Sequence, residues 1–124
     1  MISVGDIKTY YAEAALVKYT LVKLGTNKDQ VITCGVGERA IGVYMSDADA
    51  AIGDSAEIYL VGRSAELKIS TAASAGNLLS SDASGQGKLG IAGEWSPALA
   101  LEAGSIGDVI PVILVGTFVI AGEV

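Results

Sequence analysis

The apolar residues of this chain occur in short runs that glycine-rich or polar segments separate. Short runs rich in Val, Ile, Leu and Tyr are typical of β-strands, whereas an amphipathic helix needs a longer pattern with a period of 3.6 residues. Strands are expected at residues 8–11, 15–24, 31–34, 40–44, 56–61, 67–69, 78–79, 88–91, 97–101, 109–115 and 117–120. Residues 46–51 could form one helical turn, because Ser46 and Asp47 are good caps and alanines follow them.

An internal repeat organises these strands. Residues 52–62 read Ile-Gly-Asp-Ser-Ala-Glu-Ile-Tyr-Leu-Val-Gly, and residues 106–116 read Ile-Gly-Asp-Val-Ile-Pro-Val-Ile-Leu-Val-Gly. Each copy places Gly-Asp directly before a strand-forming run, and this dipeptide suits a tight turn. The repeat therefore predicts that one structural unit is used twice: strand, connector, Gly-Asp turn, strand.

The repeat also decides an ambiguous segment. Residues 96–104 carry Ser, Pro and Gly at positions that suit a capped helix, yet Ala and Leu alternate there with the period of a strand. The matching segment of the first copy, 40–44, contains Ile, Gly and Val, which disfavour a helix. We therefore predict a strand at 97–101. Gly42 within 40–44 indicates a bulge or a close approach of another backbone.

Composition agrees with a fold made of short strands. The chain has 124 residues, of which 51% are hydrophobic and sixteen are glycine. This length suits one domain, and frequent glycines disfavour long helices. We predict a mainly β fold: a compact β-barrel or β-tulip-like domain with an internal duplication of the Gly-Asp-strand unit and at most short helical turns. The whole chain, 1–124, would be a single β-rich domain, with residues 1–11 as a candidate extended N-terminal arm.

The charge balance argues against two classes of partner. Eight Lys and Arg stand against fourteen Asp and Glu, which gives a formal net charge of −6. Nucleic-acid binding depends on clustered cations, so no direct nucleic-acid contact is expected. No apolar run approaches the ~20 residues that span a bilayer, so no membrane partner is expected.

Catalytic and cofactor chemistry finds no support in the sequence. The chain has no His, which removes the commonest general base and metal ligand, and its single Cys34 follows an apolar run that predicts burial. Residues 35–40 match a dinucleotide-binding pattern, but a strand-like segment follows where that motif needs a helix. Asp47, Asp49 and Asp54 lack the regular ligand spacing of a calcium loop. We predict that the chain is not an enzyme and binds neither a metal nor a cofactor.

Aromatic and edge-forming residues are the candidates for contacts with other proteins. Large aromatic side chains are enriched in contact patches. Pro111 has no N–H to donate to a neighbouring strand. It is therefore expected at an exposed strand edge, at a bulge, or at a position where its nitrogen faces away from the neighbouring strand. The candidate contacts with a partner protein or a second subunit are Ile2, Tyr10, Tyr11, Trp95 and Pro111. For Trp95, core and surface positions remain equally open.

The order of glycines and strands resembles the small tailed-phage capsid decoration (cement) proteins. The resemblance covers about residues 31–115 and rests on four stretches: Ala40-Ile41-Gly42-Val43, the run Ile52-Gly53-Asp54-Ser55-Ala56-Glu57-Ile58, the run Ala75-Gly76-Asn77-Leu78-Leu79-Ser80-Ser81-Asp82 with Gly85, and Ala100-Leu101-Glu102-Ala103-Gly104-Ser105-Ile106-Gly107-Asp108-Val109-Ile110-Pro111-Val112.

The resemblance implies a protein that binds the outside of an icosahedral phage head and bridges neighbouring capsid subunits. It further implies a major capsid protein as partner, a homo-oligomer with a trimer favoured, and synthesis in the host cytoplasm before assembly on the virion. Some such proteins extend a capsid sheet with an N-terminal strand, which Ile2 and the residues up to Tyr11 could do here. The alternative from another class is a receptor- or glycan-binding β module of a virion surface or fibre.

Overall fold

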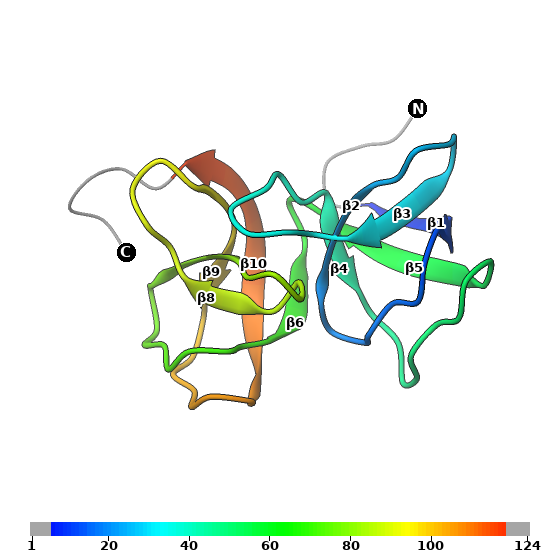
Figure 1. Cartoon of the computed structure of the whole chain (residues 1–124). Helices are drawn as coiled ribbons and strands as arrows, with labels where there is room; N and C mark the ends of the chain where they lie inside the picture. Colours follow the sequence, from blue (N-terminus) through cyan, green and yellow to red (C-terminus); the bar gives the residue numbers. More distant parts are fainter. Residues whose placement is uncertain (1–5, 119–124) are drawn as a thin grey trace.

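The computed structural model describes residues 6–118, and over this range the chain forms ten β-strands and no helix (Figure 1). The strands are β1 (Ile7–Ala12), β2 (Leu21–Leu24), β3 (Gln30–Thr33), β4 (Gly42–Tyr44), β5 (Ser55–Leu60), β6 (Ser64–Lys68), β7 (Leu78–Ser81), β8 (Gly87–Leu89), β9 (Trp95–Ala100) and β10 (Val109–Phe118). Strands β1–β5 close into a barrel in the order β1-β3-β2-β4-β5, and β6–β10 form a sheet in the order β6-β10-β9-β7-β8. The predicted mainly β, barrel-containing fold is confirmed.

The two halves have the same topology, so the internal duplication is larger than the sequence repeat. The antiparallel pairs β1–β5, β5–β4, β4–β2 and β2–β3 correspond to β6–β10, β10–β9, β9–β7 and β7–β8. The parallel pairing of β1 with β3 closes the barrel, and a single parallel bridge between Ile69 and Gly87 stands in the same place in the second half. The chain is therefore a five-stranded unit used twice in tandem.

Each half is braced by two corners, which are the connections β1–β2 and β4–β5 in the first half and β6–β7 and β9–β10 in the second. The backbones of Leu16 and Ala50 exchange two hydrogen bonds of 2.9 Å, and those of Ala73 and Gly104 exchange two of 3.0 Å. These bonds hold Ala50 in a bridge, so the helical turn expected at residues 46–51 is wrong. Pairing between corners satisfies the backbone there better than an isolated turn of helix would.

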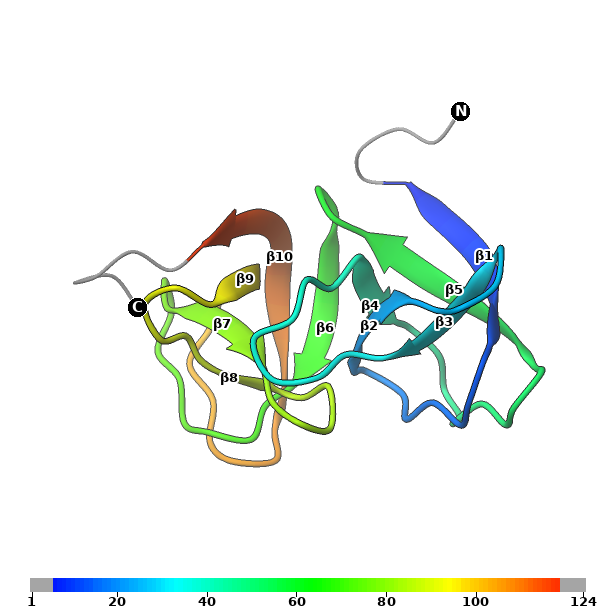
Figure 2. The same cartoon turned by 45° about the horizontal axis from the view of Figure 1, so that its top comes forward.

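The hydrophobic core has two parts that meet between the halves. Inward-facing side chains such as Val31 and Ile58 fill the first barrel. The second cluster, built on Leu67 and Val112, also takes in Leu21 and Val43 from the outer surface of the first barrel. The first barrel thus packs its outside against the second half (Figure 2).

The strand predicted at residues 97–101 is confirmed by β9. Of the three settings predicted for Pro111, the exposed strand edge is wrong. Strand β10 lies between β6 and β9. The Pro111 carbonyl accepts a 3.0 Å hydrogen bond from the N–H of Leu101, so the proline nitrogen faces the same place, where β9 has already ended. Proline removes one backbone donor, and at position 111 this donor would point toward Leu101, just past the end of β9. The inner strand β10 therefore tolerates proline there, because no hydrogen bond within the β9–β10 ladder is lost.

The predicted N-terminal arm is only partly within the described residues. Ile7 to Tyr11 pair along β5 in register, from Ile7 with Tyr59 to Tyr11 with Ser55, and the end of β1 also pairs with β3. This part of the segment is a barrel strand rather than an arm. Residues 1–5, with the candidate contact Ile2, lie outside the described residues.

Candidate functional site

A tight turn with one repeated hydrogen-bond geometry occurs five times in the described chain. In each, the N–H of the fourth residue donates to the carbonyl of the first, and the side chain of the fourth residue accepts from the N–H of the first. The turns span residues 35–38, 51–54, 74–77, 91–94 and 105–108. The glycine at the third position has a φ of +63° in the first of these turns and between +85° and +91° in the other four, which is the range of type II turns. The sequence repeat showed two of the five turns; the other three are not evident from it because Glu38, Asn77 and Glu94 replace the aspartate.

The turns at 51–54 and 105–108 present an isoleucine at their tips. Ile52 is 73% exposed and Ile106 is 74% exposed, and they hold the same position in the two halves. Asp54 accepts from the N–H of Ala51 at 2.9 Å, and Asp108 accepts from that of Ser105 at 2.9 Å. These carboxylates therefore hold the turns and leave the tip side chains projecting into solvent.

The four corners lie along one side of the molecule, the lower side in both Figure 1 and Figure 2. We call this side the corner face; it comprises the connections at residues 13–20, 45–54, 69–77 and 101–108. Its most exposed large apolar side chains are Ile52 and Ile106, with Val17 and Leu101 at 47% each. Lys18 and Asp49 tie the two corners of the first half through a 3.0 Å bond from backbone to carboxylate. The corner face is thus a firmly hydrogen-bonded surface with apolar tips.

The aromatic residues predicted as contacts differ in exposure. Tyr10 is only 6% exposed and belongs to the barrel core, with the ammonium of Lys8 4.6 Å from its ring centroid, so a contact role for Tyr10 is wrong. Tyr11, the next residue, points outward and is 52% exposed. Strand alternation explains the difference.

Trp95 lies where the two halves meet. Its backbone N–H donates to the carbonyl of Gly37 in the first half at 3.4 Å, and the Gly116 backbone packs against its ring. The guanidinium of Arg39 lies 4.1 Å from the ring centroid. The half-buried ring therefore joins the β3–β4 loop to the second half, and Arg39 covers part of its surface. The same loop contains the turn expected at residues 35–40.

The best-buried ion pair stabilises the turn at residues 91–94. Lys88 Nζ lies 2.6 Å from Glu94 Oε1, and their side chains are 16% and 17% exposed. Burial alone would raise the pKa of Glu94, but hydrogen bonds from Lys88 and from the N–H of Ile91 outweigh it and hold the pKa below its ordinary value. The pair is engaged within the fold and offers no proton-transfer group.

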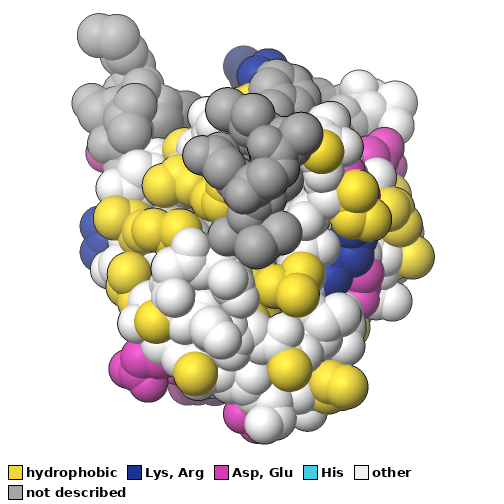
Figure 3. All heavy atoms as spheres, turned by 90° about the vertical axis from the view of Figure 1, so that its left-hand side faces the viewer, with side chains coloured by type: hydrophobic (Ala, Val, Ile, Leu, Met, Phe, Trp, Pro, Cys, Tyr) yellow, Lys and Arg dark blue, Asp and Glu magenta, His cyan; other side chains and the backbone are white. Residues whose placement is uncertain are grey.

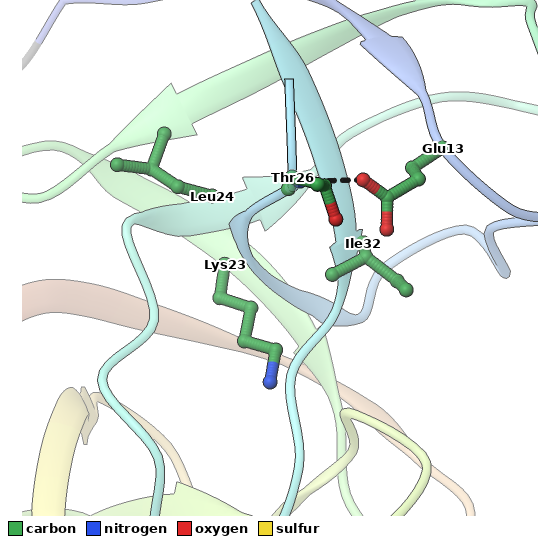
Figure 4. Close-up of a pocket in the computed structure, with 6 residues that line it drawn as sticks. Glu13, Lys23, Leu24, Thr26 and Ile32 are labelled. Atoms are coloured by element: carbon green, nitrogen blue, oxygen red, sulfur yellow. Dashed lines mark hydrogen bonds between the residues drawn. The ribbon is translucent and has the colours of Figure 1, made fainter. Parts of the chain in front are cut away.

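One shallow pocket of about 280 Å³ opens at the end of the first barrel, lined by Glu13, Lys23, Leu24, Gly25, Thr26 and Ile32 (Figure 4). Its charged groups already have partners. Glu13 accepts from the N–H of Thr26, and Lys23 Nζ lies 2.7 Å from Glu38 Oε1. Among residues 6–118 no group of three His, Cys, Asp or Glu side chains could hold a metal ion, and no helix in this range could cross a membrane.

The features gathered above define a duplicated β protein with exposed isoleucines at equivalent turns of its two halves. No family model and no curated protein sequence matches the chain. Among solved structures, its fold is similar to the head fiber gp8.5 N base of bacteriophage phi29, with a TM-score of 0.74 and 14% sequence identity. The match covers 92% of this chain and 97% of the phage chain. At this identity the likeness establishes a shared fold.

Proposed function

We propose that this chain is a structural protein of a phage head, bound to the outer surface of the shell, where it bridges neighbouring capsid subunits. Two independent lines support the proposal. The glycine and strand order resembles the capsid decoration proteins, and the fold is that of a phage head fiber base. The partner would be the major capsid protein, and a homotrimer would multiply the contacts.

The observation that carries the bridging role is the matched pair of apolar tips on the corner face. Ile52 and Ile106 stand at equivalent turns of a duplicated unit. A shell built from many copies of one capsid protein presents the same binding site on each subunit. Two equivalent isoleucine tips on one chain could therefore occupy the matching sites of two neighbouring subunits. Burial of each isoleucine is worth ~1.5–3 kcal/mol, and contacts made together add through their high effective concentration.

A rigid turn makes such tips effective. Each isoleucine precedes a glycine with positive φ, and the following aspartate accepts a backbone hydrogen bond. Little conformational freedom of the backbone is then lost on binding, which favours affinity. Tyr11, Trp95 and Pro111 remain predictions as contact residues, and so does Ile2.

The test is a binding assay with expanded, undecorated capsids. The full chain should bind them saturably and delay their thermal or chelator-induced rupture. The double variant Ile52→Asp with Ile106→Asp should bind at least about a hundredfold more weakly, because two apolar contacts are lost. Each single variant should retain partial binding but protect the shell poorly.

The matched control is Leu24→Asp, which changes a side chain of 60% exposure at the end of β2, away from the corner face (Figure 1). This variant should bind as the unmodified chain does. Failure of the unmodified chain to bind would refute the head-surface role. Equal binding by the double variant would refute the corner face as the bridging surface.

The alternative of a glycan-binding module has less support in the structure. Glycan sites commonly use exposed aromatic rings as platforms. Here Tyr10 and Tyr44 are buried, and Arg39 lies over the half-buried ring of Trp95. Tyr11 is exposed, but no second described ring with comparable exposure accompanies it.

A further inference from the structure

The two halves close their barrels differently, although they share one topology. In the first half the closing bonds join its own segments: the N–H of Tyr11 on β1 donates to the carbonyl of Asp29, next to β3, at 2.7 Å. The register of the duplication makes Lys68 and Gly85 the equivalent pair in the second half. Each of these two residues bonds to the first half instead.

Residues 19–21 of the first half, which we call the strap, fill this place in the second half. The N–H of Lys68 on β6 donates to the Tyr19 carbonyl at 2.9 Å, and the N–H of Leu21 donates to the Gly85 carbonyl of the β7–β8 hairpin at 2.7 Å. Further along, the N–H of Ser70 donates to the Gly87 carbonyl at 2.8 Å, so the second half bonds across its own seam there. Closure of the second barrel therefore passes through a segment of the first half.

The backbone of the strap is held in an unfavourable conformation. Tyr19 has a φ of +62°, whereas the equivalent position in the second half is Gly76, with a φ of +90°. A residue with a bulky side chain is strained in this region. The Tyr19 N–H donates to the Tyr44 carbonyl at 2.8 Å, and its own carbonyl accepts from Lys68, so bonds to both halves hold the strained residue in place.

The two core clusters show the same dependence of the second half on the first. All buried side chains of the first cluster belong to the first half. The second cluster joins the interior of the second half to four buried side chains of the first half: Leu21, Cys34, Ala40 and Val43. Four of the ten second-half members of this cluster are alanines, which offer little apolar area. The first half thus has a core of its own, and the second half shares its core with the first.

Other apolar side chains of the second half add nothing to its core, because they face solvent. Ile91 is 63% exposed and Ile113 is 36% exposed. Figure 3 shows the end of the molecule that the second half forms, with hydrophobic side chains exposed at many places. These side chains do not help to hold the second half together.

We propose that the strap closes the second half, and that this half opens first and as a unit while the first barrel stays closed. Opening the second half breaks the strap bonds and exposes Leu21 and Val43, but it leaves the closing bonds and the core of the first barrel intact. Opening the first half alone would remove both the strap and part of the shared core from the second half. Partial opening follows such differences in packing and closure. The opening order concerns the fold itself and does not depend on the head-surface role.

The test is hydrogen exchange of the full chain at neutral pH, followed by mass spectrometry of peptides from β1 and β5 and from β9 and β10. After correction for intrinsic rates, the hydrogen-bonded amides of β9 and β10 should exchange about tenfold faster or more than those of β1 and β5. Equal protection of both halves would show a single cooperative unit and would overturn the proposal, as would slower exchange in the second half.

A matched pair of variants tests the order of opening. Ile58→Val removes one buried methylene from the first core, and Ile110→Val removes one from the second. Ile110→Val weakens the native state against every opening, so it should speed exchange roughly two- to tenfold in both halves. Ile58→Val weakens the native and the partly open state alike, so it should speed exchange in the first half and leave the second unchanged. Faster exchange of both halves in Ile58→Val would overturn the order, and so would an effect of Ile110→Val on the second half alone.

A pair of glycine variants tests the strap. A Cβ at Gly85, whose φ is +77°, would lie 2.8 Å from the Leu21 carbonyl oxygen, whereas no atom lies within 4 Å of a Cβ at Gly93, whose φ is +91°. Both alanine variants strain a left-handed residue of the second half, but only Gly85→Ala displaces the strap. Gly85→Ala should therefore speed exchange of β9 and β10 more than about fivefold beyond Gly93→Ala.

Equal exchange of β9 and β10 in the two folded glycine variants would refute the role of the strap. Circular dichroism checks that each variant is folded. The isoleucine pair decides the order of opening even where Gly85→Ala does not fold.

Discussion

Gly42 is the position where a single added methyl group should damage the fold most clearly. It lies in β4, opposite Leu60 of β5, and is buried. A Cβ at this position would overlap the backbone carbonyl of Tyr59 and lie 3.0 Å from Cγ2 of Ile58. The overlapped carbonyl belongs to a paired strand of the barrel, so it cannot rotate away as a flexible side chain could. The sequence prediction of a close backbone approach at Gly42 is confirmed.

The cost of Gly42→Ala follows from this geometry. Overpacking in a core typically costs about 1–3 kcal/mol, and a clash with backbone belongs at the upper end. A domain of this size has a free energy of unfolding of ~5–15 kcal/mol, so a loss of ~3 kcal/mol is a large part of it. With a urea dependence of about 1–3 kcal/mol per molar, the midpoint of urea unfolding should fall by at least ~1 M.

A second glycine provides the control for this prediction. Gly53 has a φ of +85°, but no atom lies within 4 Å of a Cβ added there. Gly53→Ala should therefore cost only the backbone strain of a left-handed residue, roughly 1–2 kcal/mol. Equilibrium unfolding in urea, followed by circular dichroism, compares the two variants. If Gly53→Ala is as destabilising as Gly42→Ala, or more so, the steric argument at Gly42 is refuted.

Two further predictions concern titratable groups. The pKa of Glu94 is lower in the folded chain than its ordinary value of 4.5, so its contribution to stability is present above that value and is lost as pH falls through the folded-state pKa. Glu94→Gln should therefore lower the free energy of unfolding at neutral pH by about 1 kcal/mol. Below pH 4.5 the variant should lose less stability on acidification than the unmodified chain, as measured by urea unfolding at a series of pH values. The same pH dependence for both chains would contradict this. Burial raises the pKa of the Cys34 thiol, so a thiol reagent at pH 8 should label the folded chain far more slowly than the urea-unfolded chain. Equal labelling rates would show that Cys34 is accessible.

The local pattern predicted most strands but not which ones would be neighbours. Residues 97–101 were assigned correctly because their counterpart 40–44 disfavours a helix, and β9 forms there. The edge beside Pro111 was wrong because a missing donor indicates only that one ladder bond is absent. It does not tell whether the neighbouring strand is absent or, as here, has already ended at Ala100.

The candidate site was predicted less well than the fold. Tyr10 and Tyr11 differ by one position in a strand, and the sequence does not state which of the two faces the barrel interior. The tips Ile52 and Ile106 stood in the repeat itself, yet an isoleucine in a strand-rich sequence reads as core. Only the turn geometry shows that these two side chains point into solvent.

The sequence by itself determined the β class, the tight Gly-Asp turns and the existence of a duplicated unit, because these depend on contacts among neighbouring residues and on alternation along a strand. The tertiary structure alone decided that the duplication extends to the whole of both halves. It also decided that outward-facing side chains at equivalent strand positions of the two halves are buried to different extents. Leu21 and Leu78 occupy the same place in the repeated unit, but one is buried and the other half-buried. The physical reason is that burial of an outward-facing side chain depends on what packs against it from a distant part of the chain, and in a tandem pair only one of two equivalent faces can be covered by the other unit.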